Sequence, residues 1–274
     1  MDATPQPAVG GASQPVVPPP LAGKDYLQRY ARLWGGKLPR NYIAFDIETT
    51  GFSRNHDLLL DFGYCVVEGG YRVASGSTIL NWGSLTGEIY DIAQQKLYDL
   101  IGRMRRKGVA FPYDWRLILT GSPPHAVQRE VNAWLLQCAE QKMPVVFHYG
   151  YRFDIPFIEK HSERLLSAPL VLLPRLQLLD TAALEKGLVT QTMPQLGEDL
   201  FAFNRRALGA ANAGTFSLWE TCVPKYCLEL PADYVAEKKA IAAANGQPFA
   251  PHGAETDAVM THMLVEKYHQ LLEA

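Results

Sequence analysis

The stretch NYIAFDIETTGF, residues 41–52, decides the fold that we predict for this chain. Residues 41–47 are mostly apolar or aromatic, which predicts a buried β-strand. Asp46 and Glu48 come at the end of that strand, and side chains two residues apart on a strand point to the same face. A buried carboxylate is costly unless a cation or a metal ion compensates it, and carboxylate oxygens are the usual ligands of Mg²⁺ and Mn²⁺. Because D-x-E is a short pattern, an ordinary strand ending in exposed acids remains an alternative for this stretch alone.

The composition bounds the class of protein. The chain has 274 residues, of which 47% are hydrophobic and 20% charged, which suits one globular domain with additions or at most two small domains. No apolar run approaches the ~18 residues needed to cross a bilayer, and the first residues lack the basic and apolar parts of a secretory signal, so we expect no membrane partner. Four scattered cysteines suggest neither a disulfide scaffold nor a zinc site, and we expect a cytoplasmic location.

The chain is predicted to divide into a tail and one domain. Residues 1–23 contain six prolines and a single charged side chain, Asp2, so they have little apolar surface to bury. We predict a disordered, proline-rich tail there, with a polyproline ligand in PVVPPP as the less favoured interpretation. Residues 24–274 then form the folded domain, with a helical insertion near 84–110.

The order of predicted elements indicates the fold class. Strands are predicted at 41–47 and, as a hairpin turning at Glu68-Gly69-Gly70, within 56–82. Further strands are predicted near 143–149 and at the start of 175–187. Helices are predicted over 24–34, 88–107, 122–141, 154–166, the end of 175–187, and 255–274. Three early strands followed by alternating strands and helices predict a mixed β-sheet flanked by helices, an α/β fold.

Two other segments carry candidate functional side chains. Asp154 follows the apolar strand 145–147 and a short polar loop and stands just before a helix, where an ordinary N-cap is the simpler interpretation. His252 lies between Pro251 and Gly253 in a predicted loop, and Asp257 falls in or near the first turn of the last helix. A histidine and an aspartate five residues apart also occur by chance, so neither segment indicates a site by itself.

The ordered combination of these segments resembles a known family. DIETTG (46–51), FDIPF (153–157) and HGAETDA (252–258) resemble the three motifs of the DEDDh, or DnaQ-like, exonucleases. That family includes the proofreading subunit of bacterial replicative polymerase, RNase T and oligoribonuclease. LLDTAALEK (178–186), FSLWETCVPKYCLEL (216–230) and, in diverged form, residues 111–135 resemble the segments between those motifs, so the resemblance covers about 40–272. One departure is HYGYRFD (148–154), which is one residue longer than the family pattern and lacks its Asn.

The resemblance implies an RNase H-like fold and a metal-dependent 3′→5′ exonuclease that releases nucleoside monophosphates from DNA or RNA. It implies that two divalent ions, Mg²⁺ or Mn²⁺, are held by the four acids Asp46, Glu48, Asp154 and Asp257. His252 would be the general base that takes a proton from the attacking water. Thr49 and Phe52 match positions that contact the terminal nucleotide, although a core aromatic is nearly as good an interpretation of Phe52.

The implied partners are single-stranded DNA or RNA 3′ ends, with a homodimer or a polymerase partner also possible within the family. The net charge is −2, and the four acids alone contribute −4, so the rest of the chain is slightly basic. A basic cluster in the expected insertion (Arg103, Arg105, Arg106, Lys107) could meet phosphates, but a solvated helix face is the favoured interpretation.

Two other functional classes remain as alternatives. The first is a non-catalytic nucleic-acid-binding or assembly module that keeps the fold, which the presence of all four acids and the histidine disfavours. The second is an unrelated hydrolase on a generic α/β scaffold, which would explain two acids but not five ordered residues. Metal-dependent nucleotide release separates the exonuclease from both.

Overall fold

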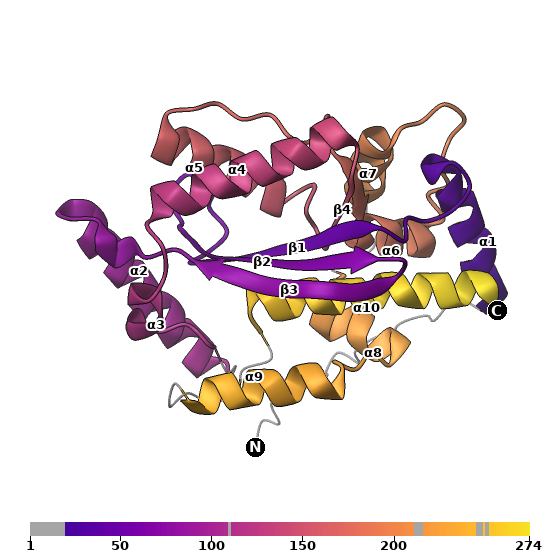
Figure 1. Cartoon of the computed structure of the whole chain (residues 1–274). Coiled ribbons are helices and arrows are strands. Elements are labelled where there is room, and N and C mark those ends of the chain that lie inside the picture. Colours follow the sequence, from indigo (N-terminus) through magenta and orange to yellow (C-terminus); the bar gives the residue numbers. More distant parts are fainter. Residues whose placement is uncertain (1–19, 109–110, 211–215, 245–248, 250–251) are drawn as a thin grey trace, which may run out of the picture.

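The computed structural model describes residues 20–108, 111–210, 216–244, 249 and 252–274 (Figure 1). The strands are β1 (Tyr42–Thr49), β2 (Leu59–Glu68), β3 (Tyr71–Ile79), β4 (Pro144–Phe147) and β5 (Gln177–Asp180). The longer helices are α1 (Pro20–Ala31), α2 (Glu88–Arg106), α4 (Pro124–Gln141), α5 (Asp154–Leu166), α6 (Thr181–Thr190), α7 (Leu200–Gly209), α9 (Ala232–Ala244) and α10 (Ala254–Glu273). The shorter ones are η1 (Arg32–Trp34), η2 (Trp82–Ser84), α3 (Trp115–Leu119), η3 (Leu218–Cys222) and α8 (Val223–Tyr226).

The five strands form one mixed sheet in the order β3-β2-β1-β4-β5. β1 pairs antiparallel with β2, and β2 antiparallel with β3, whereas β4 runs parallel to both β1 and β5. The predicted hairpin turn is present between β2 and β3, where Gly69 and Gly70 have φ angles of +61° and +91° that favour glycine. The predicted fold class, an α/β fold with a mixed sheet flanked by helices, is confirmed.

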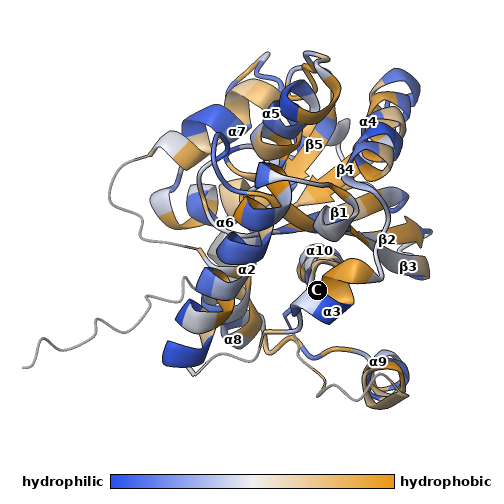
Figure 2. Cartoon of the chain, turned by 90° about the vertical axis from the view of Figure 1, so that its left-hand side faces the viewer, coloured by the Kyte–Doolittle hydropathy of each residue, from blue (hydrophilic) through white to orange (hydrophobic). Residues whose placement is uncertain are grey.

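Alternation along the strands gives the sheet two buried faces. On one face, Tyr42 and Ala44 of β1 join a hydrophobic core with side chains of α1, α6, α7 and α10. On the other face, Ile43 and Phe45 join a second core with side chains of α2, α4 and α5. In Figure 2, β4 and β5 are coloured mainly as hydrophobic, while the helices around them change from hydrophobic to hydrophilic across their width. β1 is therefore central, and the side chains at its carboxyl end lie between helices on both sides.

The start of the domain differs slightly from the predicted boundary. The predicted tail, residues 1–23, lies outside the described residues except for its last four, which belong to α1. α1 is held against the domain by Tyr26 and Tyr30, both fully buried. The helix predicted over 88–107 is present as α2, and its status as an insertion stays a prediction. None of the described helices is long and apolar enough to cross a membrane.

Candidate metal and nuclease site

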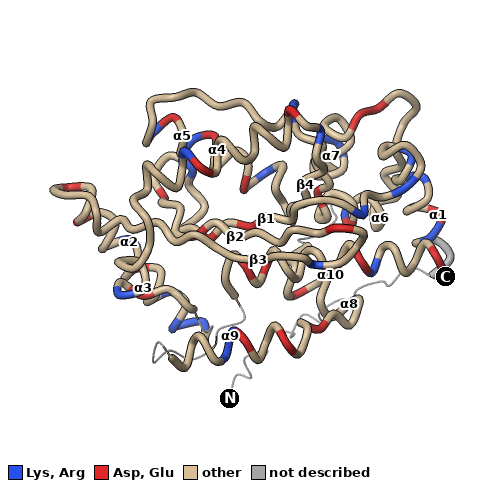
Figure 3. The backbone as a smooth tube through the Cα atoms, viewed as in Figure 1, with Lys and Arg blue, Asp and Glu red and all other residues tan. Residues whose placement is uncertain are grey.

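β1 supplies two of the predicted acids from its carboxyl-terminal half. Asp46 and Glu48 lie on the same face as Ala44, the face that α10 covers. In the antiparallel register, Asp46 lies opposite Gly63 and Glu48 opposite Asp61 of β2. Figure 3 shows acidic residues on β1 and β2, whereas most lysines and arginines lie on the helices and loops around the sheet.

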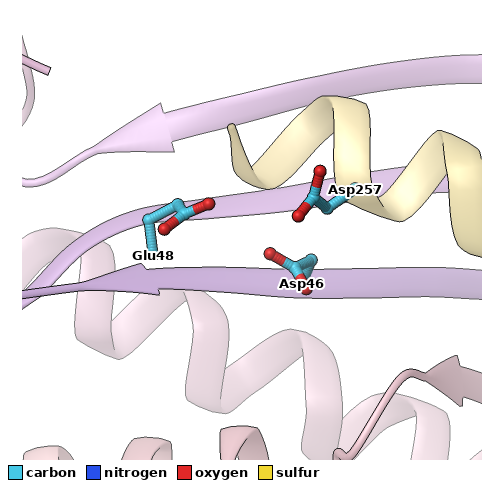
Figure 4. A group of neighbouring side chains, drawn as sticks. All are labelled: Asp46, Glu48 and Asp257. Carbon is cyan, nitrogen blue, oxygen red and sulfur yellow. The ribbon is translucent and has the colours of Figure 1, made fainter. Parts of the chain in front are cut away.

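α10 supplies a third predicted acid because its first turn approaches the sheet very closely. A Cβ atom added at Gly63 would lie only 2.0 Å from the carbonyl carbon of Ala254, so a side chain at that strand position would keep the helix away. The approach brings Asp257 to β1, and one carboxylate oxygen each from Asp46, Glu48 and Asp257 lie within 4.8 Å of one another. Figure 4 shows these three side chains directed into the space between the strand and the helix.

Asp154 lies beside this cluster but is not one of the three close carboxylates. It is the first residue of α5, it is buried, and its Oδ1 accepts a hydrogen bond from the backbone N–H of Ile47 at 3.3 Å. The N-cap position is taken by Phe153, so the carboxylate of Asp154 is directed at β1 rather than capping its own helix. The simple N-cap interpretation is therefore wrong for this residue.

Burial and mutual repulsion shape the electrostatics of the four acids. Burial, with the Asp257 carboxylate as the next contribution, raises the pKa of both Asp46 and Glu48 well above the ordinary carboxyl range. Burial also raises the pKa of Asp154 to about 8 and that of Asp257 to about 7. Four carboxylates cannot all ionise here without a compensating charge. An all-oxygen cluster of this kind fits a hard divalent cation such as Mg²⁺ or Mn²⁺.

His252 lies just before Gly253, the N-cap residue of α10, and it is partly buried. Burial lowers the pKa of its imidazole, which favours the neutral form that can accept a proton. The ring packs edge-to-face on Trp219, with centroids 4.9 Å apart, and borders a cavity of about 200 Å³ that Asp61 and Tyr113 also line. Trp219 also donates a hydrogen bond from Nε1 to Asp257 Oδ1 at 2.8 Å.

A second buried network next to the cluster involves residues that the sequence did not single out. Tyr113 donates its hydroxyl proton to Asp61 Oδ2 at 2.7 Å, and its own hydroxyl oxygen accepts a hydrogen bond from the backbone N–H of Ala254 at 3.2 Å. Tyr113 thereby ties β2 to the first residue of α10. The alternation of Asp61 with Gly63 could have placed Asp61 on the site's face once the register was known, whereas no sequence pattern points to Tyr113 or Trp219.

Thr49 and Phe52, the predicted nucleotide contacts, lie at and just after the end of β1. Thr49 donates its hydroxyl proton to the carbonyl of Gly51 at 2.7 Å, which shapes the turn. Phe52 is 90% exposed, so the core-aromatic alternative is wrong. Its ring meets that of Phe153, next to Asp154, edge-to-face at 5.9 Å. Of the basic cluster on α2, Arg103 donates to the carbonyl of Thr50 at 2.7 Å, which fixes α2 to the same turn.

The loop that departs from the family pattern is held by Asp180, at the junction of β5 and α6. Its carboxylate accepts from the backbone N–H groups of Tyr149 and Tyr151, at 3.2 and 2.8 Å, and caps α6 through Ala183 at 3.1 Å. The lengthened loop before Asp154 is thus fixed without the family's Asn. Asp180 is the acid of the D-T segment noted in the sequence. Its hydrogen bonds to the loop and to α6 give it a structural role.

Comparison with known proteins gives structural neighbours only. No protein-family model matches the chain, and no curated protein matches it significantly. Among solved structures, an exonuclease I has 12% identity and a TM-score of 0.46, over 86% of this chain and 43% of its own. A zinc-bound E. coli exonuclease I in complex with single-stranded DNA has 11% identity and a TM-score of 0.47, over 85% and 41%.

A third neighbour is a moderately thermophilic exonuclease I from Methylocaldum szegediense, with 13% identity and a TM-score of 0.42, over 86% of this chain and 42% of its own. The chain spans less than half the length of the solved structures that it matches. At these values the likeness gives no ground for transferring an activity.

Proposed function

We propose that this chain is a metal-dependent 3′→5′ exonuclease that hydrolyses terminal phosphodiester bonds of single-stranded DNA or RNA and releases nucleoside monophosphates. The observation that carries the proposal is the meeting of Asp46, Glu48 and Asp257 within 4.8 Å, with Asp154 adjacent. These are the four acids that the three ordered sequence motifs single out. The polarity of the reaction rests on the resemblance of those motifs to the DEDDh exonucleases.

The acids have the task of holding the divalent ions. When bound, such ions supply a water of lowered pKa and stabilise the leaving 3′ oxygen. Asp46, Glu48 and Asp257 present the converging oxygens, and Asp154 completes the set from the start of α5. Burial raises the pKa of all four acids and neighbouring carboxylates raise the pKa of Asp46, Glu48 and Asp154 further, so a bound cation would stabilise their charged forms.

His252 has the task of accepting the proton of the attacking water. Its partly buried position and lowered pKa keep the imidazole neutral near neutral pH. The exposed ring of Phe52 offers a surface on which a terminal base can stack, and base–aromatic stacking is worth about 1–3 kcal/mol. Thr49 shapes the turn that presents this ring.

The test is digestion of matched 3′-labelled and 5′-labelled DNA and RNA oligonucleotides with Mg²⁺ or Mn²⁺. A 3′ label should be released as mononucleotide from the first turnover, whereas a 5′ label should remain on a shortening ladder, and EDTA should abolish both. Cleavage of circular single strands at a comparable rate would indicate an endonuclease. Binding of oligonucleotides without any cleavage in either metal would favour the non-catalytic module instead.

A further inference from the structure

Trp219 contacts both a proposed metal ligand, Asp257, and the proposed general base, His252. Its indole Nε1 donates a hydrogen bond to Asp257 Oδ1 at 2.8 Å. Its ring packs edge-to-face against the ring of His252, with the centroids 4.9 Å apart and an interplanar angle of 68°. These two partners lie five residues apart, on either side of the N-cap of α10. The contacts therefore join the loop carrying the histidine to the helix carrying the acid.

The hydrogen bond from Trp219 fixes the orientation of the Asp257 carboxylate. The indole N–H holds Oδ1 of Asp257 in place, and a carboxylate oxygen of this residue lies within 4.8 Å of oxygens of Asp46 and Glu48. Partners of this kind orient metal-ligating side chains, and their loss typically weakens metal binding by about 10–100-fold.

Trp219 is itself held in place on both sides. It lies in η3, a π-helical turn. Such turns are rare in proteins, and those that occur are often found at functional sites. On the N-terminal side, Ser217 accepts from the backbone N–H of Glu220. On the C-terminal side, Lys225 and Tyr226 bond the carboxylate of the buried Glu185, at 2.6 and 2.7 Å. The indole is thus presented from an anchored segment rather than from a free loop.

We propose that Trp219 is a positioning residue for this site, which orients Asp257 through its N–H and His252 through its ring. The catalytic half of this inference rests on the proposed function, whereas the metal-binding half does not, because it can be measured without a nucleic acid. The two contacts use different parts of one side chain, so substitutions can separate them.

Trp219→Phe removes the N–H and keeps an aromatic ring against His252. We expect its Mn²⁺ affinity, measured by calorimetry without substrate, to fall by about 10–100-fold. Its exonuclease rate should return close to the wild-type value when Mn²⁺ is raised to saturation. Trp219→Leu removes both contacts, so its rate at saturating Mn²⁺ should stay lower by up to about 10²-fold, as expected for a misplaced catalytic group.

Trp115→Phe is the matched control, because Trp115 is also partly buried and also packs edge-on against a ring, that of Tyr90 at 5.3 Å. It should keep both Mn²⁺ affinity and rate. The proposal is overturned if Trp219→Phe binds Mn²⁺ like the wild type, or if its lost activity does not return at saturating Mn²⁺. A wild type that binds Mn²⁺ but releases no nucleotide would refute the nuclease function while leaving the orientation of Asp257 open to the same affinity test.

A measurement on the wild-type chain keeps the inference testable even if changes at Trp219 impair folding. Each tryptophan gives an indole N–H resonance in a ¹⁵N spectrum, and the Trp219 resonance should shift when Mg²⁺ binds, because its acceptor Asp257 then shares its charge with the ion. The Trp115 resonance should not move. An unmoved Trp219 resonance under saturating Mg²⁺ would contradict the proposal.

Discussion

Single residues of this site have separable tasks, and His252 shows this most directly. It lies outside the cluster of close carboxylates, so His252→Ala should keep the Mn²⁺ affinity of the wild type. Its rate should fall by about 10²–10⁴, the usual cost of a lost general base. A base acts in its neutral form and burial lowers the pKa of His252, so the wild-type rate should rise with pH through a value below the ordinary ~6.5. Rates from pH 5 to 8 at saturating Mn²⁺ should show this rise, and His252→Ala should lack it.

His125→Ala provides the comparison, since His125 is also partly buried but belongs to α4. It should keep the wild-type pH profile. Two results would count against His252 as the base. One is a His252→Ala enzyme with the wild-type rate, and the other is a loss of Mn²⁺ binding as complete as in Asp257→Ala.

Asp154 gives a prediction about stability as a function of pH. Burial raises its pKa to about 8 in the folded chain, whereas an unfolded aspartate titrates near ~3.9. A raised pKa contributes stability that is full below the unfolded value and is lost as pH rises through the folded value. Asp154→Asn keeps the acceptor for Ile47 but cannot ionise. In EDTA, the melting temperature of Asp154→Asn relative to that of the wild type should therefore rise as the pH is raised from 5 to 8.5.

Thermal unfolding by circular dichroism measures this difference, and Mn²⁺ should reverse it, because the wild type then gains more from the ion than the variant does. Asp99→Asn, at an exposed position on α2, should follow the wild type at each pH. If Asp154→Asn melted below the wild type at every pH in EDTA, the carboxylate would be a structural group and not a metal ligand.

Among the elements, the contact between β2 and α10 determines whether the site forms. Gly63→Ala would place a Cβ 2.0 Å from the Ala254 carbonyl carbon, so α10 must shift away from β1. Overpacking of this kind typically costs about 1–3 kcal/mol of unfolding free energy. Because Asp257 moves with the helix, Mn²⁺ affinity should fall as well. Urea unfolding and calorimetry measure the two effects.

The control for this substitution is Gly102→Ala, near the carboxyl end of α2, where the added Cβ would find its nearest contact at 3.5 Å. A compatible change from glycine to alanine stabilises by about 0.4–1 kcal/mol, and Mn²⁺ affinity should not change. A Gly63→Ala chain with unchanged metal affinity would mean that Asp257 does not depend on this close approach.

The elements also show where prediction from sequence succeeds and where it stops. β1, the β2–β3 hairpin and α10 follow from local patterns: alternation, the Gly69-Gly70 turn and helical spacing. The meeting of Asp46 with Asp257 depends instead on a contact between β2 and α10, which local patterns do not encode. Only the ordered family motifs suggested it. Trp219 and Tyr113 were missed because a buried tryptophan or tyrosine has the same sequence pattern whether it packs or donates a hydrogen bond.

On the scale of the whole molecule, the site requires residues from both ends of the domain. Asp46 lies on the first strand and Asp257 on the last helix, and the two hydrophobic cores on opposite faces of the sheet fix these elements relative to each other. Loss of either core should therefore remove metal binding together with the fold. A chain shortened from its start tests where this cooperative unit begins.

Removal of residues 1–19 and removal of residues 1–31 should have opposite outcomes. The first removes only residues that precede α1 and are predicted to have little to pack, so melting temperature and nuclease rate should stay near the wild type. The second also removes Tyr26, which donates to the Thr192 carbonyl at 3.1 Å, and Tyr30, whose ring meets that of Phe203 at 5.1 Å. Truncating one buried large aromatic typically costs about 3–5 kcal/mol, which for two approaches the whole stability of a domain. Thermal unfolding of the two shortened chains decides the boundary: a large drop on removing 1–19 would show that the proline-rich segment packs on the domain, and an unchanged melting temperature without 1–31 would show that α1 is dispensable.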